Sequence, residues 1–489
     1  MNRFLSYLPA VICTLILVCF SASALAQQVA LRQKPNIVYI IADDQGWGDT
    51  TANNSGSKIL TPGIDRIARE GMRFTDAHSA SSVCTPTRYA LLTGRYAWRT
   101  RLQKGVLGGG KRGSEPLIAE ETLTVGELLQ EHGYRTACIG KWHLGFLYEF
   151  PEGKSITRNK ELGGTSSVPV GTRLIGSPLR HGFDTFFGFH HAREMATWME
   201  DETVTENIHV KQMLSRITQE AVDYIDERGG KKDGPFFLYL PLSSPHTPIV
   251  PTEPWLGKSK LGPYGDFVMQ TDDTAVRVLE ALDRNKLADN TIVIFTADNG
   301  CAPPAKIEDL RKKGHDPMAG LRGHKADVWE GGHRVPFVVR WPGVVEAGSV
   351  SDEPICLNSL MATCADMLGV ELATDEGVDS FSILTVLRGE TIDKPTHPVI
   401  VHHSFSGKFA IRVGDWKYMH CKGSGGWSKG GDGKPFQLYN LREDRGEQNN
   451  LVDIAPQRTR AMRQALMETI ENGRSTRGPK QANDVPVNP

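Results

Sequence analysis

Two pairs of oxygen-bearing side chains have the types and positions needed for chemistry. Asp43 and Asp44 follow one long apolar run, and Asp298 and Asn299 follow another. Carboxylate and amide oxygens suit hard cations such as Ca²⁺ or, less well here, Mg²⁺, and no soft ligand accompanies them. Either pair alone is also typical of a turn or a helix cap. Their matched positions after two similar runs favour a cation site.

Basic side chains accompany the acidic pairs along the chain. They are Arg88, Lys141, His143, His246 and Lys325. Cations grouped beside a metal ion would repel one another and the ion unless the group faced an anion. The pattern therefore indicates a ligand that carries a sulfate or phosphate group, although each basic residue alone is more commonly a solvated loop residue.

The segment SSVCTPTRYALLTGR, residues 81–95, places a lone cysteine at the start of a predicted helix. We expect Thr85 to be the N-cap, Pro86 to take the first helical position and Gly94 to end the helix. At such an N-terminus the helix dipole lowers the pKa of a thiol, here that of Cys84. A nucleophilic thiol would still need a positioned base, and a free thiolate beside a cation is vulnerable to oxidation. We therefore expect Cys84 to be chemically modified.

The elements that must position these residues are apolar runs long enough for strands buried on both faces. The runs span residues 36–44, 136–145, 235–248 and 291–300. Helical patterns lie between them, for example at 122–133 and 272–285. This alternation predicts an α/β fold with a large, mostly parallel mixed sheet flanked by helices. The polar residues fall beyond the carboxyl ends of the strands, where sites form in such sheets.

The character of the sequence changes after about residue 390. Short strands predicted within 408–421 and 436–441, a Gly-rich loop between them and a helix over 456–473 indicate a smaller C-terminal domain of antiparallel sheet plus helix. We divide the chain into residues 1–26, a signal peptide; 27–393, the catalytic domain; and 394–489, the C-terminal subdomain. The tail after Arg474 is expected to be loosely held.

The N-terminus has the features of a cleaved export signal: Arg3, an apolar run and Ala24-Leu25-Ala26 as a cleavage site. The run is shorter than the roughly 20 residues that span a bilayer, so we expect no stable membrane insertion and a periplasmic or extracellular protein. The 56 Lys and Arg nearly balance 57 Asp and Glu, which gives no indication of nucleic-acid binding. The spacing of the cysteines favours neither a zinc ribbon nor a disulfide scaffold.

The run Cys84-Thr85-Pro86-Thr87-Arg88 followed by Leu92-Thr93-Gly94 resembles the signature of the type I sulfatases of the alkaline phosphatase superfamily. Further motifs occur in that family's order over almost all of the chain after residue 26. They are PNIVYIIADDQGWGD (35–49), GYRTACIGKWHLG (133–145), HGFDTFFGF (181–189), SPHTP (244–248), ADNG (297–300), RGHKADVWEGGHRVPFVVRWPG (322–343) and LYNLREDRGEQNNL (438–451).

The resemblance implies that Cys84 is oxidised to formylglycine by a transiently bound formylglycine-generating enzyme. It implies Ca²⁺ bound by the four oxygen donors, here called the ligand set (Asp43, Asp44, Asp298 and Asn299), together with the converted Cys84 and the substrate's sulfate.

The resemblance also implies roles for the basic residues. Arg88 and Lys141 would hold the formylglycine hydrate, one hydroxyl of which attacks sulfur. His246, aided by Lys325, would protonate the leaving alcohol, since His titrates near neutral pH. His143 would take the proton from the second hydroxyl and so release sulfate.

Three functions remain open at this point. The first is a sulfatase acting on sulfate monoesters of a small molecule or glycan; the second is a phosphonate monoester or phosphodiester hydrolase of the same superfamily; the third is a carbohydrate-binding protein without turnover. The segments 148–180 and 189–202 are expected to rim the pocket. Candidate sugar contacts are His190, His191, Arg193 and Trp198, with His402 and His403 as weaker ones.

Overall fold

The computed structural model describes residues 34–231 and 233–489. The predicted signal peptide lies outside these residues. No helix within them combines the length and apolar character needed to cross a membrane.

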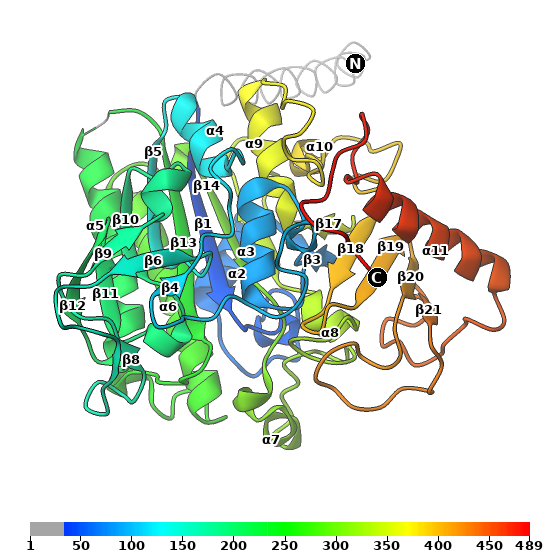
Figure 1. Ribbon diagram of the computed structural model, residues 1–489, viewed down its shortest axis with the longest axis horizontal. Coiled ribbons are helices and arrows are strands. Elements are labelled where there is room, and N and C mark those ends of the chain that lie inside the picture. Colours follow the sequence, from blue (N-terminus) through cyan, green and yellow to red (C-terminus); the bar gives the residue numbers. More distant parts are fainter. Residues whose placement is uncertain (1–33, 232) are drawn as a thin grey trace, which may run out of the picture.

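A large mixed sheet forms the centre of the molecule (Figure 1). Its five central strands, β14, β1, β13, β5 and β10, are mutually parallel, and the flanking strands are largely antiparallel. In spatial order the strands are β16 (Ser349–Ser351), β2 (Met72–Phe74), β15 (Phe337–Arg340), β14 (Thr291–Ala297), β1 (Asn36–Asp43), β13 (Phe236–Pro245), β5 (Arg135–Lys141), β10 (Thr185–Phe189), β11 (Thr197–Glu200), β12 (Thr203–Asn207), β9 (Arg173–Ile175), β6 (Phe146–Glu149) and β4 (Gly113–Ser114).

The four predicted strands are β1, β5, β13 and β14, and they are neighbours or near neighbours in the sheet. Every residue of β1, β13 and β14 is buried, as their continuous apolar sequences require for strands covered on both faces. Tyr39 of β1 pairs with Tyr239 of β13 and with Ile294 of β14. This register brings the carboxyl ends of the three strands to one edge.

Helices cover both faces of the sheet (Figure 1). One group, α3, α4 and α9, packs together, and a second group consists of α2, α5 and α6. The helices are α2 (Pro62–Arg69), α3 (Cys84–Thr93), α4 (Val125–Glu131), α5 (Met213–Lys231), α6 (Pro263–Arg284), α7 (Ile307–Lys312), α8 (Glu330–His333), α9 (Leu360–Leu368), α10 (Leu384–Leu387) and α11 (Pro456–Glu471). Helix α6 begins earlier than predicted, at Pro263, because proline is well suited to a first turn.

The start of α3 differs from the prediction. Val83 is the N-cap and Cys84 is the first helical residue, so Thr85 does not cap the helix. The Thr85 hydroxyl instead accepts a hydrogen bond of 3.2 Å from the backbone N–H of Leu107. The predicted end is confirmed: Gly94 adopts a left-handed conformation, with φ of 64°.

The C-terminal residues form an antiparallel sheet of β18 (Ile400–His403), β19 (Phe409–Val413), β20 (Trp416–Met419) and β21 (Gln437–Asn440), on which α11 packs. The predicted fold class is thereby confirmed. Buried ion pairs join this sheet to the central body: Arg412 lies 2.6 Å from Asp76, and Lys417 lies 3.0 Å from Glu330.

The tail is not loose, contrary to the expectation. The N–H of Ser475 donates to Val378 O at 3.0 Å, and the N–H of Asp484 donates to Arg99 O at 2.8 Å. The side chain of Asp484 also pairs with Arg95 at 2.7 Å. These contacts offset the entropy cost of ordering a polar segment.

Candidate active site

The ligand set lies at the carboxyl ends of β1 and β14, and each member is at most 2% exposed. The backbone N–H of Asp44 donates to Asp298 Oδ1 at 3.2 Å, and Asn299 Nδ2 donates to Asp44 Oδ1 at 2.8 Å. Asp44 holds a left-handed conformation, with φ of 68°, which asparagine and aspartate tolerate better than most residues. Hydrogen bonds thus link residues about 250 positions apart into one cluster.

Two oxygens of this cluster, Asp43 Oδ1 and Asn299 Oδ1, are buried without any protein hydrogen-bond partner. Ligand atoms of Asp43, Cys84 and Asp298 lie within 4.8 Å of one another. Burial and the neighbouring Asp43 raise the pKa of Asp298, as expected for two carboxyls forced together. An all-oxygen set with unsatisfied acceptors and mutual repulsion fits a hard divalent cation.

Three basic side chains surround the ligand set. Arg88 donates to Asp298 Oδ2 through Nε at 3.1 Å and Nη2 at 2.7 Å, and Lys141 Nζ donates to Asp43 Oδ2 at 2.5 Å. Lys325 Nζ pairs with Asp44. Burial raises the pKa of Asp43, but Lys141, His246 and Arg88 together lower it well below its usual value. Asp43 is therefore held in its charged form, whereas the pKa of Asp298 stays raised despite its hydrogen bonds from Arg88.

The backbone places Lys325 beside the start of α3. Its own N–H donates to Cys301 O at 3.0 Å, and the next N–H, of Ala326, donates to Ser82 O at 2.8 Å. A residue far along the chain is thereby held close to Cys84.

Cys84 lies at the bottom of a cavity and is 3% exposed. Burial raises the pKa of its thiol, and this effect outweighs the opposing influence of Lys141 and Lys325. The expectation of a helix-lowered pKa is therefore wrong, because desolvation opposes the charged form more strongly than the dipole and cations favour it. An unmodified Cys84 would be a poor nucleophile.

His143 and His246 differ in the ring nitrogen that is hydrogen-bonded to a backbone carbonyl. His143 Nε2 donates to Leu107 O at 2.9 Å, which leaves Nδ1, a buried atom without a partner, as the acceptor. Burial first, and then Lys141, lowers the pKa of His143 well below 6.5, so its ring is neutral. His246 Nδ1 donates to Thr247 O at 2.6 Å, and its Nε2 lies 3.6 Å from Asp44 Oδ2.

The cavity above Cys84 has a volume of about 940 Å³, within the roughly 300–1,000 Å³ range of small-molecule sites. Lys141, His143, His246 and Lys325 line its catalytic end. Other walls come from residues 105–108, from 158 and 163–166 around the β7 (Thr157–Arg158) and β8 (Ser166–Ser167) hairpin, and from 191–193. Among residues 34–231 and 233–489, no carboxylate belongs to its lining.

The C-terminal subdomain supplies the aromatic wall. Phe405 and Trp427 line the cavity with ring centroids 5.3 Å apart, and Trp427 is 44% exposed. Buried Asp327 accepts a hydrogen bond of 2.8 Å from the N–H of Trp427, which fixes this loop two residues from Lys325. Sequence reasoning missed both aromatic residues; the only signal was a tryptophan within a Gly-rich loop.

The predicted sugar contacts divide into two pairs. His191 and Arg193 line the cavity, whereas His190 and Trp198 do not, and both of the latter are 0% exposed. His190 packs against Phe146, and the Trp198 indole donates to Glu200 Oε1 at 3.2 Å. The placement of His190 and Trp198 at the cavity is therefore corrected. His191, which follows His190 and has extended backbone, lines the cavity because successive side chains of such backbone alternate in direction.

The weaker candidates are also placed away from the cavity. His402 stacks on His333 with ring centroids 3.6 Å apart, between the central body and the C-terminal sheet. His403 packs against Phe409. All six described cysteines are buried and unpaired.

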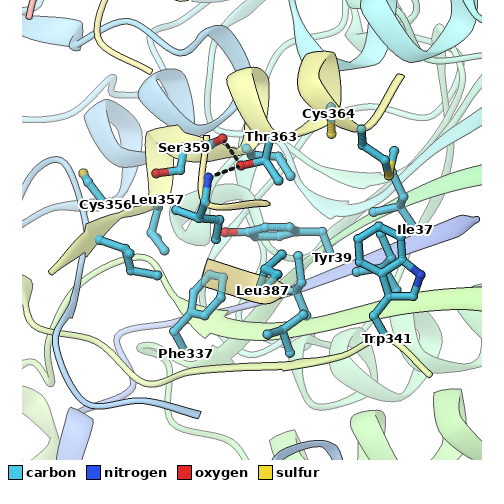
Figure 2. Close-up of a pocket in the computed structure, with 17 residues that line it drawn as sticks. Ile37, Tyr39, Phe337, Trp341, Cys356, Leu357, Ser359, Thr363, Cys364 and Leu387 are labelled. Atoms are coloured by element: carbon cyan, nitrogen blue, oxygen red, sulfur yellow. Dashed lines mark hydrogen bonds between the residues drawn. The ribbon is translucent and has the colours of Figure 1, made fainter. Parts of the chain in front are cut away.

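Figure 2 shows a second cavity, enclosed between the sheet and α9 and lined by residues such as Tyr39, Phe337 and Trp341. Its volume is about 30 Å³, and none of the described residues that line it is charged. The hydroxyl of Thr363 in this region is satisfied, because it donates to Ser359 O at 2.7 Å. This cavity has neither the space nor the groups for chemistry on an anion.

Comparison with known proteins agrees with this geometry. The family model described as Sulfatase matches residues 35–370. The N-acetylgalactosamine-6-O-sulfatase of Bacteroides thetaiotaomicron is 32% identical over 490 residues, which cover 90% of this chain and 93% of that protein. The N-acetylgalactosamine-6-sulfatase of Mus musculus is 29% identical over 435 residues, covering 83% and 75%. A solved structure from Bacteroides thetaiotaomicron, described with the metabolism of multiple glycosaminoglycans, has a TM-score of 0.75 and 29% identity, and covers 89% of this chain and 99% of that one.

Proposed function

We propose a mechanism for this chain, which belongs to the sulfatase family as a type I member of the alkaline phosphatase superfamily and hydrolyses sulfuric esters of glycans. In this mechanism, hydrolysis uses formylglycine made from Cys84 together with Ca²⁺. The observation that carries the proposal is the convergence of the ligand set and three cations beside Cys84, with two buried oxygens still lacking partners. When bound, Ca²⁺ would stabilise negative charge on the sulfuryl oxygens, and hydrated formylglycine would supply an attacking hydroxyl.

The chain's own residues then have distinct tasks. Arg88 and Lys141 orient the nucleophile and balance the charges of Asp298 and Asp43 through the hydrogen bonds described above. His246, whose Nε2 faces the ligand set from the cavity wall, donates a proton to the departing alcohol oxygen, with Lys325 beside it.

His143 completes the cycle. Its neutral ring has an available acceptor at Nδ1, since Nε2 is committed to Leu107 O. That nitrogen would take up a proton from the modified Cys84 side chain as sulfate is released.

A 6-O-sulfated hexosamine is our proposed substrate. The names of the two relatives support it, and the cavity is large enough for a sugar with part of its neighbour. The aromatic wall of Phe405 and Trp427 offers an apolar surface to a sugar ring. We further propose that residues 1–26 direct export and that a formylglycine-generating enzyme acts on Cys84 before the site closes.

Mass spectrometry of the peptide spanning 81–95, followed by sulfate release from a panel of sulfated mono- and oligosaccharides, tests the proposal. We expect the mass change of thiol-to-aldehyde conversion and turnover that chelation of Ca²⁺ suppresses. Faster cleavage of a matched phosphodiester would support the phosphonate or phosphodiester hydrolase alternative. Persistent thiol with sugar binding and no turnover would support the binding protein.

A further inference from the structure

Two arginines on the cavity wall have no role in the proposed mechanism. Arg158 ends β7 and Arg193 follows β10, so they come from separate segments, and both are exposed. Arg158 Nε donates to Gly164 O at 2.7 Å, which orients the side chain while its two terminal amino groups remain available. Within the described residues, neither guanidinium lies within 4 Å of a carboxylate.

The charge of the cavity wall distinguishes these arginines from ordinary surface residues. At the catalytic end, Arg88, Lys141 and Lys325 are each paired with a carboxylate of the ligand set. Arg158 and Arg193 line the same cavity, whose lining contains no carboxylate. In the part of the chain that the structure describes, their charges therefore have no carboxylate counterpart.

A wall with this composition attracts anions. Guanidinium groups bind sulfate and carboxylate with two parallel hydrogen bonds, a geometry that ammonium groups cannot offer. A single exposed arginine is commonly just solvated, but two from different segments facing one carboxylate-free cavity form a composite surface. Nearby His191 also lines this wall; its Nε2 lies 3.8 Å from Glu194 Oε1 and makes no hydrogen bond within the described residues.

We propose that Arg158 and Arg193 form a second anion subsite, which binds a sulfate or carboxylate on the sugar next to the one that loses its sulfate. The preferred substrate is then a polyanionic glycan segment. This inference rests on the proposed function for the scissile sulfate, and it adds a requirement for a second negative group.

Matched disaccharides test the subsite. All carry the same 6-sulfated hexosamine, and the adjacent sugar is a uronate, the same sugar with its carboxyl reduced to an alcohol, or that alcohol bearing a second sulfate. We expect kcat/KM about 10- to 100-fold higher for the two charged forms than for the neutral one, mainly through KM, as charge-assisted hydrogen bonds permit. A preference for only one charged form would identify the group as carboxylate or sulfate.

Arg158→Gln and Arg193→Gln should each remove most of this preference, because the advantage of the charged forms depends on the two guanidinium groups. Lys160→Gln is the matched control, since Lys160 is exposed in the same hairpin and does not line the cavity. Equal wild-type kcat/KM for charged and neutral forms, or an equal loss in the control, would overturn the subsite.

Binding of the same disaccharides to Cys84→Ala protein, measured by calorimetry, separates the two proposals. If wild-type protein hydrolyses none of them but the Cys84→Ala protein prefers the charged forms, with the preference lost in the arginine variants, the subsite stands and the proposed function fails. Equal affinity for charged and neutral forms would refute the subsite whatever the turnover.

Discussion

Replacement of Arg88 by methionine probes the charge balance of the site. Arg88 is fully buried, donates twice to Asp298 Oδ2 and once to Lys141 O at 3.0 Å, and lies 3.8 Å from Asp43 Oδ1. Methionine has a similar length and no charge, so the change removes the cation while it preserves much of the packing.

The expected loss follows from these contacts. Removal of one partner from a buried ion pair typically costs about 3–5 kcal/mol, because the other charge is left uncompensated. At about 4 Å and an effective dielectric constant of about 20, each charge pair contributes roughly 4 kcal/mol, which agrees with that range. In the presence of chelator we therefore expect Arg88→Met to lose about 3–5 kcal/mol of unfolding free energy.

Calcium should reduce this loss. Without Arg88, the negative charge of Asp298 is no longer balanced by a guanidinium, and Ca²⁺ is no longer repelled by a buried positive charge. We therefore expect the variant to bind Ca²⁺ at least about tenfold more tightly. Sulfate release should nevertheless fall by about 10²- to 10³-fold, as for loss of one charge-stabilising donor.

The measurement is thermal and urea unfolding of the wild type, Arg88→Met and Arg88→Lys. Each protein is unfolded in the presence of chelator and over a series of Ca²⁺ concentrations. Arg88→Lys should fall between the other two, since it keeps the charge and loses the two-pronged contact. Arg158→Gln should leave unfolding unchanged. An equal stability loss with and without Ca²⁺, or weaker Ca²⁺ binding by Arg88→Met, would refute the assignment of Asp298 as a metal ligand.

Three further predictions concern separate parts of the molecule. Cys84→Ala should abolish sulfate release while circular dichroism stays unchanged, and near-normal turnover would contradict the mechanism. Trp427→Ala should lower kcat/KM for sulfated disaccharides up to about tenfold, as loss of ring stacking predicts, and spare a small alkyl sulfate; equal loss on both would argue against a sugar platform. Burial lowers the pKa of His181 to about 4, so the unfolded chain binds a proton at this residue more readily than the folded protein does. The free energy of unfolding should therefore fall by up to about 3 kcal/mol as the pH drops from about 6.5 to 4. His181→Phe, which keeps the stacking on Trp142, should flatten this part of the pH dependence in calorimetry, and an unchanged slope would count against it.

The sequence by itself determined the buried strands and the acidic residues at their ends, because these depend on local patterns. A long apolar run followed by Asp-Asp or Asp-Asn encodes both a buried strand and the ligands at its end, as β1 and β14 show. Gly94 ends α3 for an equally local reason, since glycine readily adopts a left-handed conformation.

Only the tertiary structure decided which side chains face the substrate and how burial changes their chemistry. His190 and His191 are neighbours in the sequence, yet only His191 lines the cavity, and Trp427 reaches it from the C-terminal subdomain. The raised pKa of the Cys84 thiol likewise reflects desolvation by residues from many segments. The exposure and the desolvation of a side chain depend on its contacts with many distant parts of the chain. No local pattern of residues specifies those contacts.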